Sequence, residues 1–268
     1  SLTGVLAKNL SEPLGYSGFG LHLFLSTLLS GFLFTLVVYV LYKGYEVKAD
    51  NPLKLSEIPK FNRDQWLTII AIIVMVICCI GFKLDTGLFA FAAAAVLILL
   101  GAVDEKKAIK GIPWGTLVFI CGVGVLINVI DTLGGITLIS DFLTKFMSEH
   151  TAAPILAATS GILSWVSSTT GVVMPTLFPI AADVCKTFGG ANYVELISAI
   201  TATSFAAAIS PLSTGGAIIM SSYSAARETS TEELNKMFKT LFLLSVGNVL
   251  LNVLLSALGI FKLGGLFY

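Results

Sequence analysis

The segment from 19 to 43 is predominantly apolar, rich in leucine, phenylalanine and valine, and is closed by Lys43. A helix needs about 20 such residues to cross the hydrocarbon core of a bilayer. The whole chain has the same character: 56% of its residues are hydrophobic and 12% are charged, where globular domains carry about 25% charged residues. We therefore expect an all-α, polytopic membrane protein whose main partner is the lipid bilayer.

Further apolar segments follow along the chain. The runs 66–82 and 87–103 are separated by a short polar turn and predict a helical hairpin. The runs 114–130 and 237–261 are also long enough to span a bilayer. The segment 133–147 is amphipathic, which favours a helix lying in the membrane interface.

The polar connector 44–64 contains two prolines and charged residues of both signs, which predicts an exposed linker. We place a boundary between two halves of the chain there. Residues 1–43 are then the end of a first repeat that is mostly missing, including one full span, and residues 65–268 form a second repeat.

Several function classes lack their sequence signals. The formal net charge is zero, so no basic excess indicates a nucleic-acid partner. The four cysteines and two histidines show no spacing typical of a metal site or a disulfide framework. Catalytic motifs such as His-Glu-x-x-His, Gly-x-Ser-x-Gly and a glycine-rich nucleotide loop are also missing, so we do not expect an enzyme.

The sequence Ser-Pro-Leu-Ser-Thr-Gly-Gly at 210–216 lies inside the apolar segment 193–227. A proline followed by two glycines interrupts a helix. Within a membrane, the freed backbone groups are tolerated only where protein buries them or a wet cavity reaches them. We therefore expect a broken transmembrane helix over 193–227. A proline kink with only a packing role is the alternative.

A second hydroxyl-rich segment lies within 152–188. Two apolar arms, 152–166 and 171–182, are each short for a membrane crossing and meet at the Ser-Ser-Thr-Thr-Gly sequence of 167–171. This pattern favours a re-entrant hairpin with a hydroxyl-rich tip. The alternative is one long helix in which the hydroxyls bond back to preceding carbonyls.

The distribution of basic residues predicts the orientation. With the connector 44–64 in the cytoplasm, the loops 104–111 and 227–239 lie there too, and the hairpin 152–188 enters from outside. Eleven of the sixteen basic residues are then inside, as the positive-inside rule favours. These eleven are Lys43, Lys48, Lys54, Lys60, Arg63, Lys106, Lys107, Lys110, Arg227, Lys236 and Lys239.

Local signals predict two details near the carboxyl end. Ser230 or Thr231 can cap the last helix, with Glu233 near its third position. Asn248 and Asn252 lie four residues apart, on one face of that helix, and are expected to bond to neighbouring helices.

With these motifs placed, the layout resembles the carboxyl-terminal half of carriers in the ion transporter superfamily, most closely the malonate/C4-dicarboxylate type related to divalent anion/sodium symporters. Such carriers have two inverted repeats. Each repeat contains a re-entrant hairpin with a Ser-Asn-Thr tip, and a broken helix. Here 167–169 is similar to the tip and 210–215 is similar to the break. Ser168 stands where the pattern has asparagine, which removes an amide donor. The Ser-Leu-Thr-Gly of 1–4 is also similar to 213–216, as expected of a repeat.

The resemblance implies a secondary transporter of the cell membrane that moves a small dicarboxylate by alternating access, coupled to Na⁺ or H⁺. It implies the missing amino-terminal repeat as a partner, is compatible with a homodimer, and requires no cofactor beyond Na⁺ as the coupling ion. The substrate-binding residues would be Ser167, Ser168, Thr169, Thr170, Ser210, Ser213, Thr214 and Gly215. The Na⁺ ligands would be Ser168, Thr169, Ser210 and Thr214.

Two alternatives stay open. A cation/proton or arsenite-type antiporter of the same superfamily would need a titratable group in the membrane, for which Asp131 and Asp183 are the candidates. A membrane scaffold without transport activity would use the same hydroxyl and glycine clusters for close helix packing.

Overall fold

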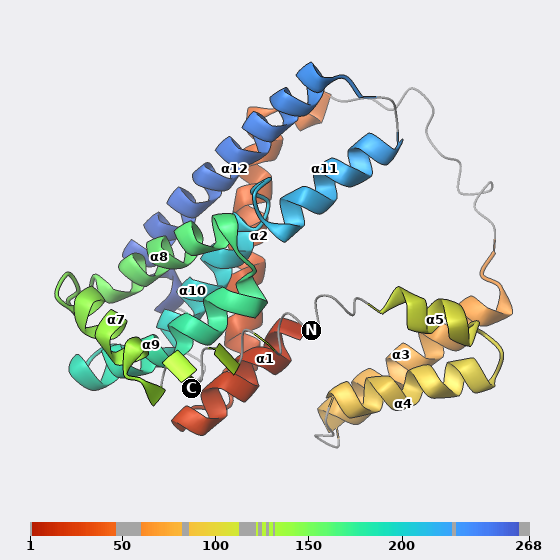
Figure 1. The fold of residues 1–268 in the computed structure, drawn as a ribbon, viewed down its shortest axis with the longest axis horizontal. Coiled ribbons are helices and arrows are strands. Elements are labelled where there is room, and N and C mark those ends of the chain that lie inside the picture. The colour runs from red at the N-terminus through yellow and green to blue at the C-terminus, as the bar shows by residue number, and fades with distance from the viewer. Residues whose placement is uncertain are drawn as a thin grey trace. The chain divides into compact units, whose positions relative to one another are not determined.

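The computed structural model describes residues 2–46, 60–81, 86–112, 122, 125–126, 129–130, 132–226 and 229–262. The chain divides into two compact units, one of residues 1–45 and 118–268 and the other of residues 46–117, and each is described here by itself. Across the described ranges every regular element is a helix, as the composition predicted (Figure 1). The repeat boundary expected at 44–64 stays a prediction.

The smaller unit contains the predicted hairpin. Helices α3 (Arg63–Gly81) and α4 (Thr86–Leu99) pack against each other. The loop expected at 104–111 is wrong in part, because a short helix α5 (Glu105–Gly111) forms there. The Asp104 side chain accepts a hydrogen bond from the backbone N–H of Lys107 at 2.9 Å, which caps the helix.

The larger unit contains the other helices. Along the chain they are α1 (Leu2–Ser11), η1 (Glu12–Leu14), α2 (Gly20–Leu41), η2 (Gly44–Glu46), α7 (Gly135–Thr144), α8 (Ala152–Val166), η4 (Thr169–Val173), α9 (Met174–Thr187), α10 (Tyr193–Ala207), α11 (Thr214–Ala226) and α12 (Thr231–Ala257). Of these, α2 and α12 are long and apolar enough to cross a membrane. The predicted amphipathic helix at 133–147 corresponds to α7, whereas most of the predicted span 114–130 lies outside the described residues.

Helix α10 forms the centre of the larger unit. It contacts α2, α8, α9 and α12 (Figure 1). Most of its residues are buried. Helix α8 approaches α10 and α12 closely at Gly161, where an added Cβ would collide with Val249 of α12 and crowd Thr203 of α10. A small residue at this contact therefore sets how closely the three helices pack.

Helix α12 begins with the predicted cap. The Ser230 hydroxyl accepts from the N–H of Glu233 at 3.2 Å, and the Glu233 carboxylate accepts from the N–H of Ser230 at 3.1 Å. This reciprocal pair satisfies two backbone donors that the first turn cannot satisfy itself. The prediction of a cap at Ser230 with Glu233 is confirmed.

Polar side chains on one face of α12 bond to neighbouring helices, as predicted for Asn248 and Asn252. The Asn248 amide donates to the carbonyl of Ala206 in α10 at 3.1 Å. The Asn252 carbonyl oxygen accepts from the Ser30 hydroxyl of α2 at 2.6 Å, and the Asn252 amide donates back to Asn248. This ladder links α2, α12 and α10 through buried groups.

We predict that Asn252→Leu lowers the free energy of unfolding by about 1 kcal/mol, because the buried Ser30 hydroxyl loses its partner. Denaturant titration of the purified protein in detergent measures this change. Thr240→Val is the matched control, since the Thr240 hydroxyl donates to the Lys236 carbonyl of its own helix and bonds to no other helix among the described residues. An equal effect of the two substitutions would contradict the role of the ladder.

Candidate functional site

Two interruptions of helical structure lie in the larger unit. Helix α8 ends at Val166, and Ser167 and Ser168 are extended, with φ of −138° and −90°, before the π-helical turn η4 leads into α9. Helix α10 ends at Ala207, and α11 begins only at Thr214. Both interruptions fall at the hydroxyl-rich motifs 167–171 and 210–216. The re-entrant hairpin and the broken transmembrane helix themselves stay predictions.

The turn between α8 and α9 satisfies much of its own backbone. The Ser168 hydroxyl accepts from the N–H of Gly171 at 3.1 Å, and the Ser168 carbonyl accepts from the N–H of Val172 at 2.9 Å. The Ser167 hydroxyl donates back to the Leu163 carbonyl at 2.6 Å. Pro175 sits in the first turn of α9, where a missing N–H costs least. Ser167 and Ser168 therefore shape the turn itself.

The segment between α10 and α11 is a tight turn stabilised by Ser213. Its hydroxyl lies 2.5 Å from the Ala208 carbonyl and 3.0 Å from the Ser210 carbonyl. Both glycines are required by space: a Cβ at Gly215 would lie 2.5 Å from the Ala208 oxygen, and one at Gly216 would collide with the Ser210 carbonyl. The Gly-Gly pair lets the first turn of α11 approach the end of α10.

Hydrogen bonds join the two interruptions directly. The hydroxyls of Ser164 and Thr169 both reach the Ser204 carbonyl in the last turn of α10, at 2.7 and 3.0 Å. The Ser210 hydroxyl donates in the opposite direction, to the Trp165 carbonyl at 3.0 Å. The end of α8 and the end of α10 are therefore held together by side chains that satisfy each other's terminal carbonyls.

Three of these oxygens form a buried triangle. The Ser164 and Thr169 hydroxyl oxygens are 3.0 Å apart, and each lies within 3.0 Å of the Ser204 carbonyl oxygen. Only two hydroxyl protons are available for these three contacts. Ser164 and Ser204 are fully buried, and Thr169 is 5% exposed. Such a group of neutral oxygens can accept a hard cation.

The electrostatics of the site come from helix ends. Neither interruption contains a charged side chain. The carboxyl ends of α8 and α10 bring partial negative charge, while the amino ends of η4 and α11 bring partial positive charge. The site can therefore favour a cation on one side and an anion on the other without a lysine or arginine.

The predicted site residues have different places in this geometry. Thr169 and Ser210 reach carbonyls of the other interruption, whereas Ser167, Ser168 and Ser213 bond within their own turns. Thr170 is partly buried, Thr214 is the first residue of α11, and Gly215 gives close backbone approach.

The sequence interpretation missed Ser164, Ser204 and the carbonyl of Trp165. Ser164 lies one turn before the predicted hairpin tip, and Ser204 ends a Thr-x-Thr-Ser run just before the break. The Thr-x-Thr-Ser run was therefore a sequence signal from which Ser204 could have been found. Which oxygen of the run faces α8 depends on how the helices pack.

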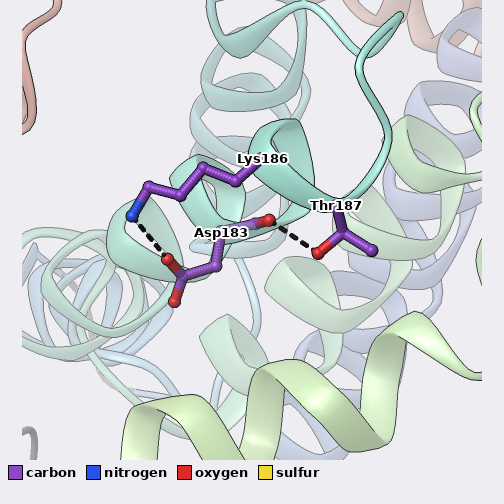
Figure 2. A network of polar contacts seen from close by, with 3 residues as sticks. All are labelled: Asp183, Lys186 and Thr187. Carbon is purple, nitrogen blue, oxygen red and sulfur yellow. Dashed lines mark hydrogen bonds and ion pairs between the residues drawn. The ribbon is translucent and has the colours of Figure 1, made fainter.

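Of the two carboxylates suggested for proton coupling, Asp183 is described and belongs to α9, outside both interruptions. The Asp183 carboxylate accepts from the Lys186 ammonium at 2.9 Å on one face of α9, and its side chain is 35% exposed (Figure 2). The Asp183 carbonyl accepts from the Thr187 hydroxyl. Asp183 is thus a surface ion-pair residue, and Asp131 lies outside the described residues.

Comparison with known proteins gives one match. A family model described as a citrate transporter matches residues 1–209. No curated protein and no solved structure matches the chain. The matched range includes both arms and the tip of the α8–α9 segment and all of α10, and it ends just before Ser210.

We predict that Gly216→Ala destabilises the protein by about 1–3 kcal/mol, because the new methyl group collides with the Ser210 carbonyl in a turn that has no room for it. Thermal unfolding in detergent measures the change. Gly247→Ala is the control, since a Cβ there meets open space on α12. A Gly216 variant as stable as the Gly247 variant would contradict the tight turn described above.

Proposed function

Because this chain belongs to the citrate transporter family, we propose that it moves citrate or a smaller dicarboxylate across the cell membrane by alternating access, coupled to Na⁺. The family is one of secondary transporters of membranes, so the protein is a transporter and not an enzyme. The family description favours citrate, and the resemblance of the layout to malonate/C4-dicarboxylate carriers supports a smaller dicarboxylate as the alternative.

One observation carries this proposal: the two helix interruptions are joined by mutual hydrogen bonds. Irregular backbone at membrane depth persists only where protein or a wet cavity satisfies it. Discontinuous helices are the places where transporters hold ions and substrates. A scaffold would gain nothing from interrupting two helices at the same contact, because continuous helices satisfy their own backbone.

The coupling ion would occupy the triangle of Ser164, Thr169 and Ser204. Carbonyl and hydroxyl oxygens suit a hard cation. This cluster has three close oxygen–oxygen contacts but only two hydroxyl protons to form hydrogen bonds in them. The ends of α8 and α10 add partial negative charge. Ser168, Ser210 and Thr214 remain proposed ligands from the family resemblance.

The substrate would bind at the amino ends of η4 and α11. Backbone N–H groups and the helix dipole favour carboxylates there. Ser167, Thr170, Ser213 and Gly215 belong to these two turns and complete the proposed binding surface. A bound cation nearby would add the positive charge that the side chains lack.

The arrangement in the membrane follows from the same proposal. The connector 44–64 lies in the cytoplasm, and α8 and α9 form a re-entrant hairpin entered from outside. The substrate site is completed by an inverted first repeat, whose end is residues 1–43, and two copies can associate as a homodimer.

Uptake by proteoliposomes tests the substrate and the coupling ion. We expect saturable uptake of labelled citrate that unlabelled malonate or succinate inhibits and that falls when choline replaces Na⁺. Uptake that follows a proton gradient and ignores Na⁺ would instead support the proton-coupled alternative. The absence of uptake of all three carboxylates, with correctly folded protein, would overturn the transport proposal.

We predict that Thr169→Val weakens Na⁺ binding and carboxylate binding together, each roughly ten- to hundredfold. The loss of one buried hydroxyl ligand costs on the order of 1–3 kcal/mol of binding free energy. Since coupling is reciprocal, raising Na⁺ should partly restore carboxylate binding. Thr159→Val is the control: within the part of the chain that the structure describes, the Thr159 hydroxyl donates to the Ile155 carbonyl of its own helix and to no other helix. Unchanged Na⁺ dependence in Thr169→Val would remove this hydroxyl from the site.

We predict that a cysteine at position 168 reacts with a membrane-impermeant thiol reagent, because the backbone at the tip cannot face lipid. A cysteine at position 163, inside α8, is the comparison. Substrate or Na⁺ should slow the reaction at position 168. Equal inertness of both cysteines in every condition would argue for a tip buried in protein.

A further inference from the structure

A groove of about 420 Å³ lies between α11 and the first turns of α12. It shares no residue with the two helix interruptions. Tyr223 of α11 forms one side, and the residues from α12 follow the spacing of a single helix face. The lining residues are Tyr223, Glu233, Lys236, Met237, Thr240 and Leu241.

Helix α12 changes character along this groove. Two glutamates and two lysines precede Thr240 in the helix, whereas residues 240–257 contain no charged side chain. This apolar part of α12 is about 27 Å long, which nearly matches the hydrocarbon core of a bilayer, about 30 Å. The groove therefore lies where the lipid headgroups meet the hydrocarbon, with its charged end at the headgroups.

Glu233 and Lys236 give this end of the groove both signs of charge. They are three residues apart and so share a face of α12. The exposed Lys236 ammonium has no ion pair within the ranges that the structure describes. The Glu233 carboxylate accepts from the Ser230 N–H at 3.1 Å, and a carboxylate can accept about four hydrogen bonds. The pair therefore suits a ligand that carries a cation beside an anion.

The other end of the groove is apolar. Met237 and Leu241 lie one and two turns beyond Glu233, and both side chains are half-buried. Tyr223 has an apolar ring and a polar tip, which is typical of residues at a membrane interface. From Glu233 to Leu241 the lining thus passes from charged to apolar, in the same order as a phospholipid passes from headgroup to acyl chain.

We propose that this groove binds phosphatidylethanolamine. The lipid phosphate accepts from the Lys236 ammonium, the primary ammonium of the headgroup donates to the Glu233 carboxylate, and an acyl chain packs against Met237 and Leu241. Phosphatidylcholine carries the same charges, but its quaternary ammonium has no N–H to donate. This site goes beyond the transport proposal, because it uses neither helix interruption and requires no substrate or coupling ion.

Native mass spectrometry of the purified protein in detergent tests the site, with dioleoyl phosphatidylethanolamine and dioleoyl phosphatidylcholine as probes. We expect the ethanolamine lipid to bind about fivefold more tightly, as one partly screened ion pair allows. Lys236→Gln should weaken both lipids, since both contain the phosphate. Glu233→Gln should lower ethanolamine binding to the level of choline, and glutamine still completes the helix cap.

Matched controls come from the same turns of α12. Glu232 and Lys239 do not line the groove, so Glu232→Gln and Lys239→Gln should leave both affinities unchanged. Equal binding of the two lipids to the wild type would overturn the proposal. Tighter binding of phosphatidylglycerol, weakened equally by Lys236→Gln and Lys239→Gln, would show a general attraction to anionic lipid and contradict it as well.

Discussion

The rest of the structure depends on the need to satisfy backbone groups where two helices stop inside an apolar protein. Ser164 and Thr169 reach the Ser204 carbonyl near the end of α10, and Ser210 reaches the Trp165 carbonyl near the end of α8. Each interruption thus supplies donors to the other. The two helix ends are stable as a pair, and altering one turn is expected to disturb the other.

Close packing around α10 is the second condition for this contact. Gly161 lets α8 approach α10 and α12, while Asn248 and Ser245 of α12 bond to carbonyls in the last turn of α10. Asn252 extends the same polar ladder to α2. The end of α10 is therefore held on several sides, which fixes the carbonyl of Ser204 in place for the hydroxyls of α8 and η4.

The absence of charged side chains from both interruptions has a functional consequence. In the proposed mechanism, a site made of hydroxyls, carbonyls and helix ends would bind ions weakly enough to release them during transport. In the proposed mechanism the cation and the carboxylate support each other's binding, because neither finds a formal counter-charge in these two protein segments. Asp183 adds no formal charge to these two segments, because it lies on α9 and pairs there with Lys186.

The sequence alone determined the helical character of this protein and several of its helix boundaries. Apolar length and low charge predicted a helical membrane protein, Pro211 with the two glycines predicted the interruption after α10, and local hydrogen-bonding signals predicted the cap of α12, because each depends on residues close in the chain. The sequence analysis expected a loop at 104–111 and missed the short helix α5, which Asp104 caps. Only the tertiary structure decided which oxygens meet. Ser164, Thr169 and Ser204 come from segments up to 40 residues apart, and their meeting depends on how α8 is rotated against α10, which helical periodicity does not encode.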